Sequence, residues 1–188
     1  MHTVTTHDRS LLALVGSIAL AALAVAALAV EWWGVSGAVI VAALAIGASA
    51  ALVDARSGRI PNRLVAAALV PILVLIASLA TAGSGEHALG AVALGGLAFA
   101  GPIFVVHLVS PRAMGFGDVK LAAMLGATLG LVEPRLGLLA LCLAAAVTAT
   151  IGLFVHSGSL PFGPGLVLGA TMALLIAGQL GEEALRWR

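Results

Sequence analysis

Long runs of apolar and small residues, separated by short polar segments, occupy most of this sequence. The first run, Leu11–Val30, has 20 residues, and a helix rising about 1.5 Å per residue would carry it across a hydrocarbon core of about 30 Å. Only 9% of the residues are charged, against about 25% in ordinary soluble domains. Because a backbone in lipid must satisfy its own hydrogen bonds, helices are favoured. The pattern predicts an all-α membrane protein, a polytopic helical bundle of about seven transmembrane helices.

We expect residues 1–188 to form a single integral-membrane domain with its core at 35–180. Residues 1–34 would add an N-terminal transmembrane helix and an outer loop. A cleaved signal peptide is the alternative for the first run, because Ala27-Leu28-Ala29 resembles a cleavage site. The run is longer than the usual apolar core of about 7–15 residues, which favours a retained helix. The predicted spans are, in order, Leu11–Val30, Val35–Val53, Leu64–Ala82, Ala88–Val109, Val119–Val132, Leu136–Val155 and Gly165–Leu180.

The basic residues give the orientation of these spans. If the polar segment 54–63 faces the cytoplasm, the basic residues on that side are Arg9, Arg56, Arg59, Arg63, Arg112 and Lys120, and those on the other side are Arg135, Arg186 and Arg188. This asymmetry obeys the positive-inside rule. We therefore predict a multi-pass protein of the plasma (cytoplasmic) membrane, in contact with membrane lipid and with its N-terminus in the cytoplasm.

Composition excludes several classes of partner and cofactor. The net charge is +1 and no basic run is present, so we expect no nucleic-acid partner. The single cysteine, Cys142, rules out an internal disulfide and a cysteine-based zinc site, and we expect it to be a small buried packing residue. His107 and His156 lack a matched carboxylate at metal-ligand spacing, so we predict no metal and no cofactor.

Two aspartates lie at the ends of predicted spans, on the same side of the membrane. Asp54 follows the second span, and Asp118 opens the fifth behind Gly115-Phe116-Gly117. A charge at bilayer depth is costly and is a functional candidate by default, and glycine lets the backbone turn tightly and lets another backbone approach the carboxylate. Of two carboxylates sharing a site, one keeps its proton while the other takes a proton from water, which permits peptide hydrolysis without a metal. The alternative is structural, with each aspartate paired to a neighbouring Arg or Lys.

The motifs around these aspartates resemble those of the type IV prepilin peptidases. They are Asp54 followed after five residues by Ile60-Pro61-Asn62, then Gly115-Phe116-Gly117-Asp118-Val119-Lys120-Leu121, and Pro161-Phe162-Gly163-Pro164. The resemblance covers about residues 35–180. It implies that Asp54 and Asp118 are the catalytic pair of a Gly-x-Gly-Asp intramembrane aspartic protease, with a supporting motif of Gly115, Gly117, Lys120, Ile60, Pro61 and Asn62. The implied substrates are prepilin-like proteins of type IV pilus and protein-secretion systems, cut at the cytoplasmic membrane face just before their hydrophobic helix.

The chain also departs from some relatives. Many bacterial members carry a cytosolic insert with paired cysteines and methylate the new N-terminus. This chain has one cysteine and no such insert, so it resembles the short peptidase-only forms, and we expect no methyl transfer. Signal-peptide peptidases and presenilins share Gly-x-Gly-Asp but pair it with a Tyr-Asp motif, and this chain has no tyrosine.

Further residues receive more local predictions. Lys120 lies about 200° around a helix from Asp118, so we expect it to reach lipid phosphate rather than the partner of Asp118. Phe162 and Gly163 are predicted to line the substrate entrance, with a plain loop anchor as the alternative. Small residues four apart permit close helix packing, and we expect such packing within the bundle at Gly126-x-x-x-Gly130 and Gly165-x-x-x-Gly169.

Two other functions fit the same pattern. A small proton- or cation-coupled transporter would use both aspartates, although such carboxylates usually lie near the bilayer midplane. An inactive pilus-assembly membrane protein is the other. Under the protease hypothesis, the positive end of a helix macrodipole favours an ionised Asp118 and the negative end a protonated Asp54. We therefore expect Asp118 to be the base and Asp54 the acid.

Overall fold

The computed structural model describes residues 37–53, 62–81, 85–111, 114–154 and 162–185. All the regular structure in this part of the chain is α-helix. The predicted first span, 11–30, lies outside the described residues. The helices are Gly37–Val53, α2 (Asn62–Thr81), α3 (Gly85–Val109), α4 (Phe116–Gly130), α5 (Leu136–Phe154) and α6 (Gly163–Leu185).

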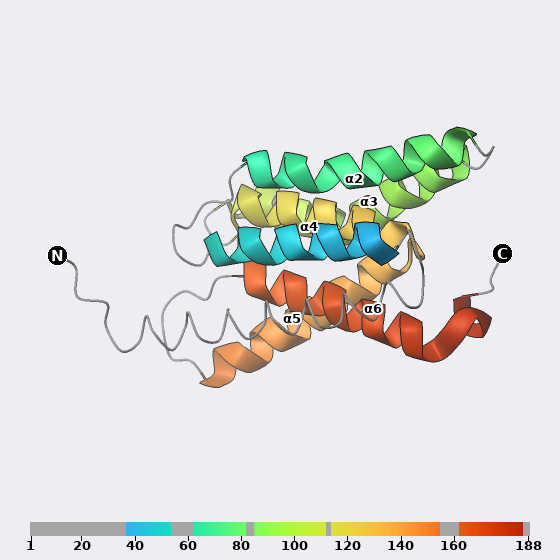
Figure 1. Cartoon of the computed structure of the whole chain (residues 1–188). Coiled ribbons are helices and arrows are strands. Elements are labelled where there is room, and N and C mark those ends of the chain that lie inside the picture. The colour runs from blue at the N-terminus through green and yellow to red at the C-terminus, as the bar shows by residue number, and fades with distance from the viewer. Residues whose placement is uncertain (1–36, 54–61, 82–84, 112–113, 155–161, 186–188) are drawn as a thin grey trace.

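Successive helices run in alternating directions (Figure 1). The same end of the bundle therefore holds Val53, Asn62, Val109, Phe116, Phe154 and Gly163. Because helices are the only regular structure in the described residues, the predicted all-α class is confirmed. Two segments, α3 and Leu136–Leu153 of α5, are long and apolar enough to cross a membrane. Shorter apolar helices run over Gly37–Val53, Ala66–Thr81 and Gly163–Gln179.

Several predicted span boundaries differ from the helix ends by two to five residues, and two of them show why. The fifth predicted span begins at Val119, whereas α4 begins at Phe116 and includes Asp118 in its first turn. The seventh ends at Leu180, whereas α6 continues to Leu185. Both differences have one cause. Each predicted span ends at the first charged residue, whereas the helix continues past that residue. An acidic residue is favourable in a first turn, and Glu, Ala and Leu are good helix formers.

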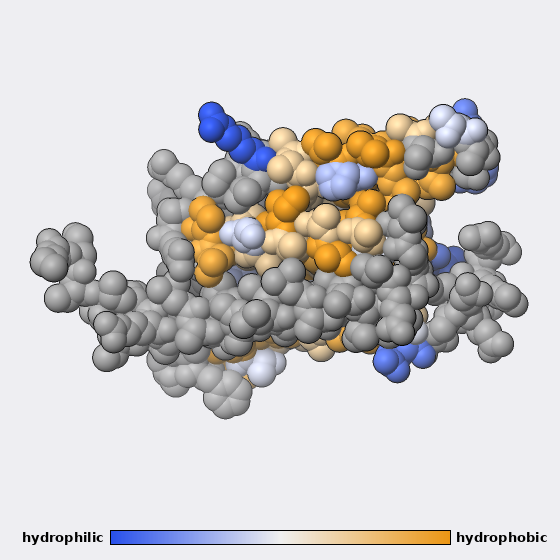
Figure 2. Space-filling view, viewed as in Figure 1, coloured by the Kyte–Doolittle hydropathy of each residue, from blue (hydrophilic) through white to orange (hydrophobic). Residues whose placement is uncertain are grey.

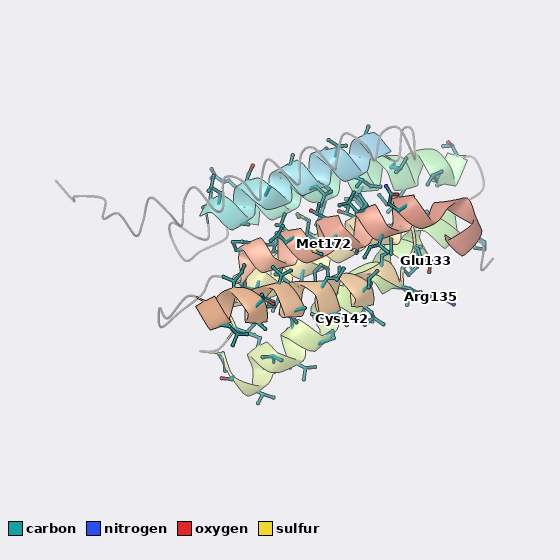
Figure 3. All side chains as sticks on the ribbon, turned by 90° about the horizontal axis from the view of Figure 1, so that it is seen from below. Glu133, Arg135, Cys142 and Met172 are labelled. Carbon is teal, nitrogen blue, oxygen red and sulfur yellow. The ribbon has the colours of Figure 1, made fainter. Side chains whose placement is uncertain are left out.

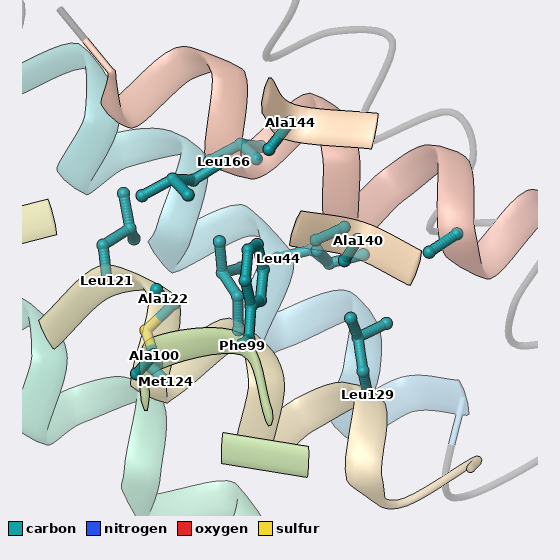
Figure 4. Close-up of a cluster of buried hydrophobic side chains, with 14 of the residues drawn as sticks. Leu44, Phe99, Ala100, Leu121, Ala122, Met124, Leu129, Ala140, Ala144 and Leu166 are labelled. Carbon is teal, nitrogen blue, oxygen red and sulfur yellow. The ribbon is translucent and has the colours of Figure 1, made fainter. Parts of the chain in front are cut away.

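Helix α4 is the centre of the described bundle. Apart from Lys120 and Ala123, every residue from Val119 to Gly130 is buried. Helices α2, α3, α5 and α6 all contact α4, and Gly47 brings the Gly37–Val53 helix against Met124 and Leu125. Figure 4 shows the resulting cluster, in which Phe99 of α3 lies among side chains from the surrounding helices. A helix enclosed by protein need not match the bilayer thickness, and the 15 residues of α4 span only about 22 Å.

Glycines bring the backbones of α3 and α4 into direct contact. A Cβ atom on Gly126 would lie 2.8 Å from Phe99 Cβ and 3.0 Å from Gly96 Cα, and one on Gly130 would lie 2.8 Å from Val92 Cα. Cβ atoms in proteins essentially never approach other atoms closer than 3.0 Å. The predicted packing role of Gly126-x-x-x-Gly130 within the bundle is thus confirmed, and its partner surface is α3. We call this contact the α3–α4 glycine seam.

A second pair of small residues joins α5 to α6. A Cβ atom on Gly169 would lie 2.6 Å from the Ala144 nitrogen and 2.7 Å from Ala144 Cβ, and one on Gly165 would strike the Thr148 hydroxyl. The predicted close packing at Gly165-x-x-x-Gly169 is therefore also confirmed. It draws α6 against the face of α5 formed by Ala140, Ala144 and Thr148.

Many large apolar side chains are exposed on the described part of the bundle. On the face in Figure 2, the described surface is mainly hydrophobic in the middle, and the most hydrophilic residues lie toward the ends. Leu97, Val74 and Leu153 are among the exposed apolar side chains of the described helices. Glu133 and Arg135, 3.9 Å apart between Glu Oε1 and Arg Nε, occupy the turn between α4 and α5 (Figure 3).

Cys142 was expected to be buried, and this prediction is wrong: it is exposed on α5 (Figure 3). Lipid tails are as apolar as the core of a helical bundle. An apolar run therefore predicts a span without identifying which of its sides faces protein.

The glycine seam gives a stability prediction. Gly126→Ala should force α3 and α4 apart and lower the free energy of unfolding by about 1–3 kcal/mol, the usual cost of overpacking. Gly90→Ala is the matched control, because a Cβ atom there would meet nothing within 4 Å. Thermal unfolding in detergent, followed by circular dichroism, should show a lower midpoint for Gly126→Ala alone. Equal unfolding midpoints for the two variants would contradict the close α3–α4 packing at Gly126.

Candidate active site

Asp118 lies in the first turn of the central helix α4. Its backbone N–H donates a hydrogen bond to the Gly115 carbonyl, with 3.1 Å between the heavy atoms. The residue as a whole is half-buried, and its Oδ1 atom is fully buried. The next residues on α4, Val119, Leu121 and Ala122, belong to the apolar core. The carboxylate is thus fixed at the boundary between this core and the end of the bundle.

Gly115 leaves a space beside the Asp118 carboxylate. Its backbone angles, φ −72° and ψ 146°, are ordinary extended values that any residue can adopt. The turn into α4 therefore does not itself require a glycine. A Cβ atom at this position would lie 3.4 Å from Asp118 Oδ2. Since Gly115 is exposed, its missing side chain leaves Oδ2 approachable from that side. Gly117 is half-buried within the first turn of α4.

Lys120 is directed onto an aromatic ring. Its Nζ atom lies 4.8 Å from the centroid of Phe116, one helical turn earlier. This distance is within the range of a cation–π interaction. The structure places the ammonium group over Phe116, and the predicted contact with lipid phosphate stays a prediction.

His107, near the end of α3, contacts the loop that leads to Asp118. Its Nδ1 atom lies 2.8 Å from the Met114 carbonyl oxygen, and its ring centroid lies 5.5 Å from that of Phe116. Sequence reasoning considered His107 only as a metal ligand and missed this contact. Within the described residues, no three His, Cys, Asp or Glu side chains are grouped as metal ligands would be.

The helix that precedes Asp54 ends at the same end of the bundle as Asp118 (Figure 1). Position 47 lies against Leu121, Met124 and Leu125 of α4, and the two helices run in opposite directions. Val53 lies six residues after Gly47, about 9 Å along the axis, which brings it to the level of the first turn of α4. Asp54 itself lies outside the described residues.

The remaining predicted site residues fall into two groups. Ile60 and Pro61 lie outside the described residues, whereas Asn62 begins α2. Phe162 and Gly163 lie at the start of α6, where Phe162 is half-buried against the core and Gly163 is buried. Both are thus at the same end of the bundle as Asp118.

Comparison with known families identifies the chain. Residues 38–178 match the model of the type IV leader peptidase family. The chain belongs to the type IV leader peptidase family. Searches of curated proteins and of solved structures gave no match. The family implies an aspartic-type peptidase that acts on prepilin-type substrates, and together with the two long apolar helices it indicates a membrane protein.

The space at Gly115 predicts a variant of this leader peptidase that folds but cleaves poorly. Gly115→Ala suits the backbone angles but puts a methyl group against Asp118 Oδ2. We expect unchanged thermal stability, because 3.4 Å is an ordinary van der Waals contact. If the substrate uses this space, the cleavage rate should fall on the order of 10- to 100-fold, the cost of holding a substrate about 1 Å from its productive position. The cleavage rate is measured by using mass spectrometry to monitor leader removal from a prepilin-like substrate.

Gly90→Ala, on the exposed side of α3, again serves as the control and should cleave at the wild-type rate. Wild-type cleavage by Gly115→Ala would show that the space beside Oδ2 is not needed.

Proposed function

We propose that this protein is a membrane aspartic endopeptidase that removes the leader peptides of type IV prepilin-like proteins at the cytoplasmic membrane face. Asp54 and Asp118 form its catalytic pair in this proposal. The observation that carries it is the position of Asp118: a half-buried carboxylate in the first turn of the central helix. It lies at the end of the bundle where the Gly37–Val53 helix ends, and Asp54 is the next residue in the sequence.

The proposed chemistry divides proton transfer between the two carboxylates. The ionised one, Asp118, takes a proton from water, and the oxygen of that water attacks the carbonyl carbon of the peptide bond. The protonated one, Asp54, donates to the carbonyl oxygen. As the tetrahedral intermediate collapses, the C–N bond breaks, Asp118 gives its proton to the leaving amine, and Asp54 recovers its proton as the hydroxyl becomes a carbonyl. The buried Oδ1 of Asp118 supports this role, because a site with little water strengthens electrostatic interactions.

The location of the site suits a substrate that is itself a membrane helix. Peptide bonds within such a helix are occupied in its own hydrogen bonds, so the segment to be cleaved must unwind where water is available. A carboxylate at the end of the bundle, with an open space at Gly115, meets that need. Phe162 and Gly163, at the same end, are proposed to line the entrance, and Gly117, Lys120, Ile60, Pro61 and Asn62 to support the motif.

The proposal also includes the predicted topology. It places seven spans in the plasma membrane, with the N-terminus in the cytoplasm and a single domain over residues 1–188. The core would lie at 35–180, and 1–34 would be an added helix and outer loop. The alternating helix directions (Figure 1) and the basic residues of segment 54–63 support this orientation. The proposal includes no methyl transfer.

Substitution of the two aspartates tests the catalytic pair. Asp54→Asn and Asp118→Asn should each reduce leader cleavage on the order of 10²–10⁴-fold, the usual contribution of a general acid or base. Glu133→Gln is the matched control, because it removes the same charge at the opposite end of α4. Co-expression with a prepilin-like substrate gives the cleaved fraction by mass, and the amount of each variant in the membrane is measured in parallel.

The control should cleave as the wild type does. Full cleavage by both aspartate variants would reject the protease assignment of these residues and favour the transporter.

A further inference from the structure

The loop between α3 and α4 is held by a side chain that the proposed chemistry does not use. His107 Nδ1 lies 2.8 Å from the carbonyl oxygen of Met114, the residue immediately before Gly115. A carbonyl oxygen can only accept, so Nδ1 must carry the hydrogen and donate it. In the neutral imidazole this leaves the lone pair on Nε2.

The same ring also reaches the residue after Gly115. The rings of His107 and Phe116 are 5.5 Å apart between centroids and are tilted by 41°. Lys120 Nζ lies over the Phe116 ring, 4.8 Å from the ring centroid. His107 therefore holds both neighbours of Gly115, Met114 through a hydrogen bond and Phe116 through a ring contact.

The residue held between them connects directly to Asp118. The Gly115 carbonyl accepts the Asp118 N–H at 3.1 Å, and the space left by its missing side chain adjoins Oδ2. We propose that His107 is the positioning residue of this peptidase: its Nδ1–H bond to Met114 fixes the Gly115 peptide and thereby the Asp118 carboxylate. This rests on the proposed function, in which Asp118 is catalytic.

Substitutions can separate the two contacts of His107. Asparagine places an amide N–H near the position of Nδ1 and keeps the donor but loses the ring, whereas phenylalanine keeps a ring and loses the donor. We expect His107→Phe to lower kcat on the order of tenfold, the scale of one lost hydrogen bond, with KM unchanged. His107→Asn should restore most of the wild-type kcat. His87→Phe, at the far end of the same helix and exposed, is the control and should cleave normally.

A second measurement does not depend on cleavage. In full-length protein labelled with ¹⁵N-histidine, the signals missing from His107→Phe belong to His107. They should show a hydrogen on Nδ1, the donor to the Met114 carbonyl. A hydrogen on Nε2 alone would overturn the proposal, as would equal kcat values for the Asn and Phe variants. If no variant and no wild type cleaved any leader, the proposed function would fail while the nitrogen spectrum still decided the hydrogen bond.

Discussion

Direct backbone contact between α3 and α4 is the constraint on which the rest of the bundle depends. At Gly95, Gly126 and Gly130 the two helices come so close that no Cβ atom fits between them. In lipid there is little hydrophobic gain from pairing apolar helices, so close van der Waals contact has to supply the attraction. This contact places α4 in the interior, where the remaining helices can surround it. A short helix enclosed in this way can carry a carboxylate on its first turn.

The end of α4 is organised by contacts that reach across the α3–α4 loop. His107, Phe116 and Lys120 form a continuous series of contacts beside Gly115. On the other side of Gly115 lies the Asp118 carboxylate. The glycine is therefore explained by the space that it leaves, since its backbone angles suit any residue. Under the proposal that Asp118 is catalytic, that space has a purpose, because a peptide substrate must approach the carboxylate closely.

The sequence predicted the helices of the described residues, the two glycine pairs and the position of Asp118 at the head of a helix, because each depends on local pattern. It did not predict that α4 begins at Phe116 or that Cys142 is exposed. An apolar run in the sequence stops at a charged residue, whereas the helix can continue past it. Side chains that face lipid are as apolar as those that face protein, so hydropathy does not tell the two sides of a helix apart. The contacts of Lys120 with Phe116 and of His107 with Met114 depend on helix register. The pairing of Asp54 with Asp118 remains a prediction.

The exposed thiol on α5 has a practical consequence. Cys142 is the only cysteine of the chain, and it lies early in α5, away from the end where Asp118 is found. A thiol-reactive dye or spin label would therefore have one possible target in the natural protein, without first replacing other cysteines. Because the site is outside the glycine seam, a probe there would report on the surroundings of the bundle while leaving the central helix undisturbed.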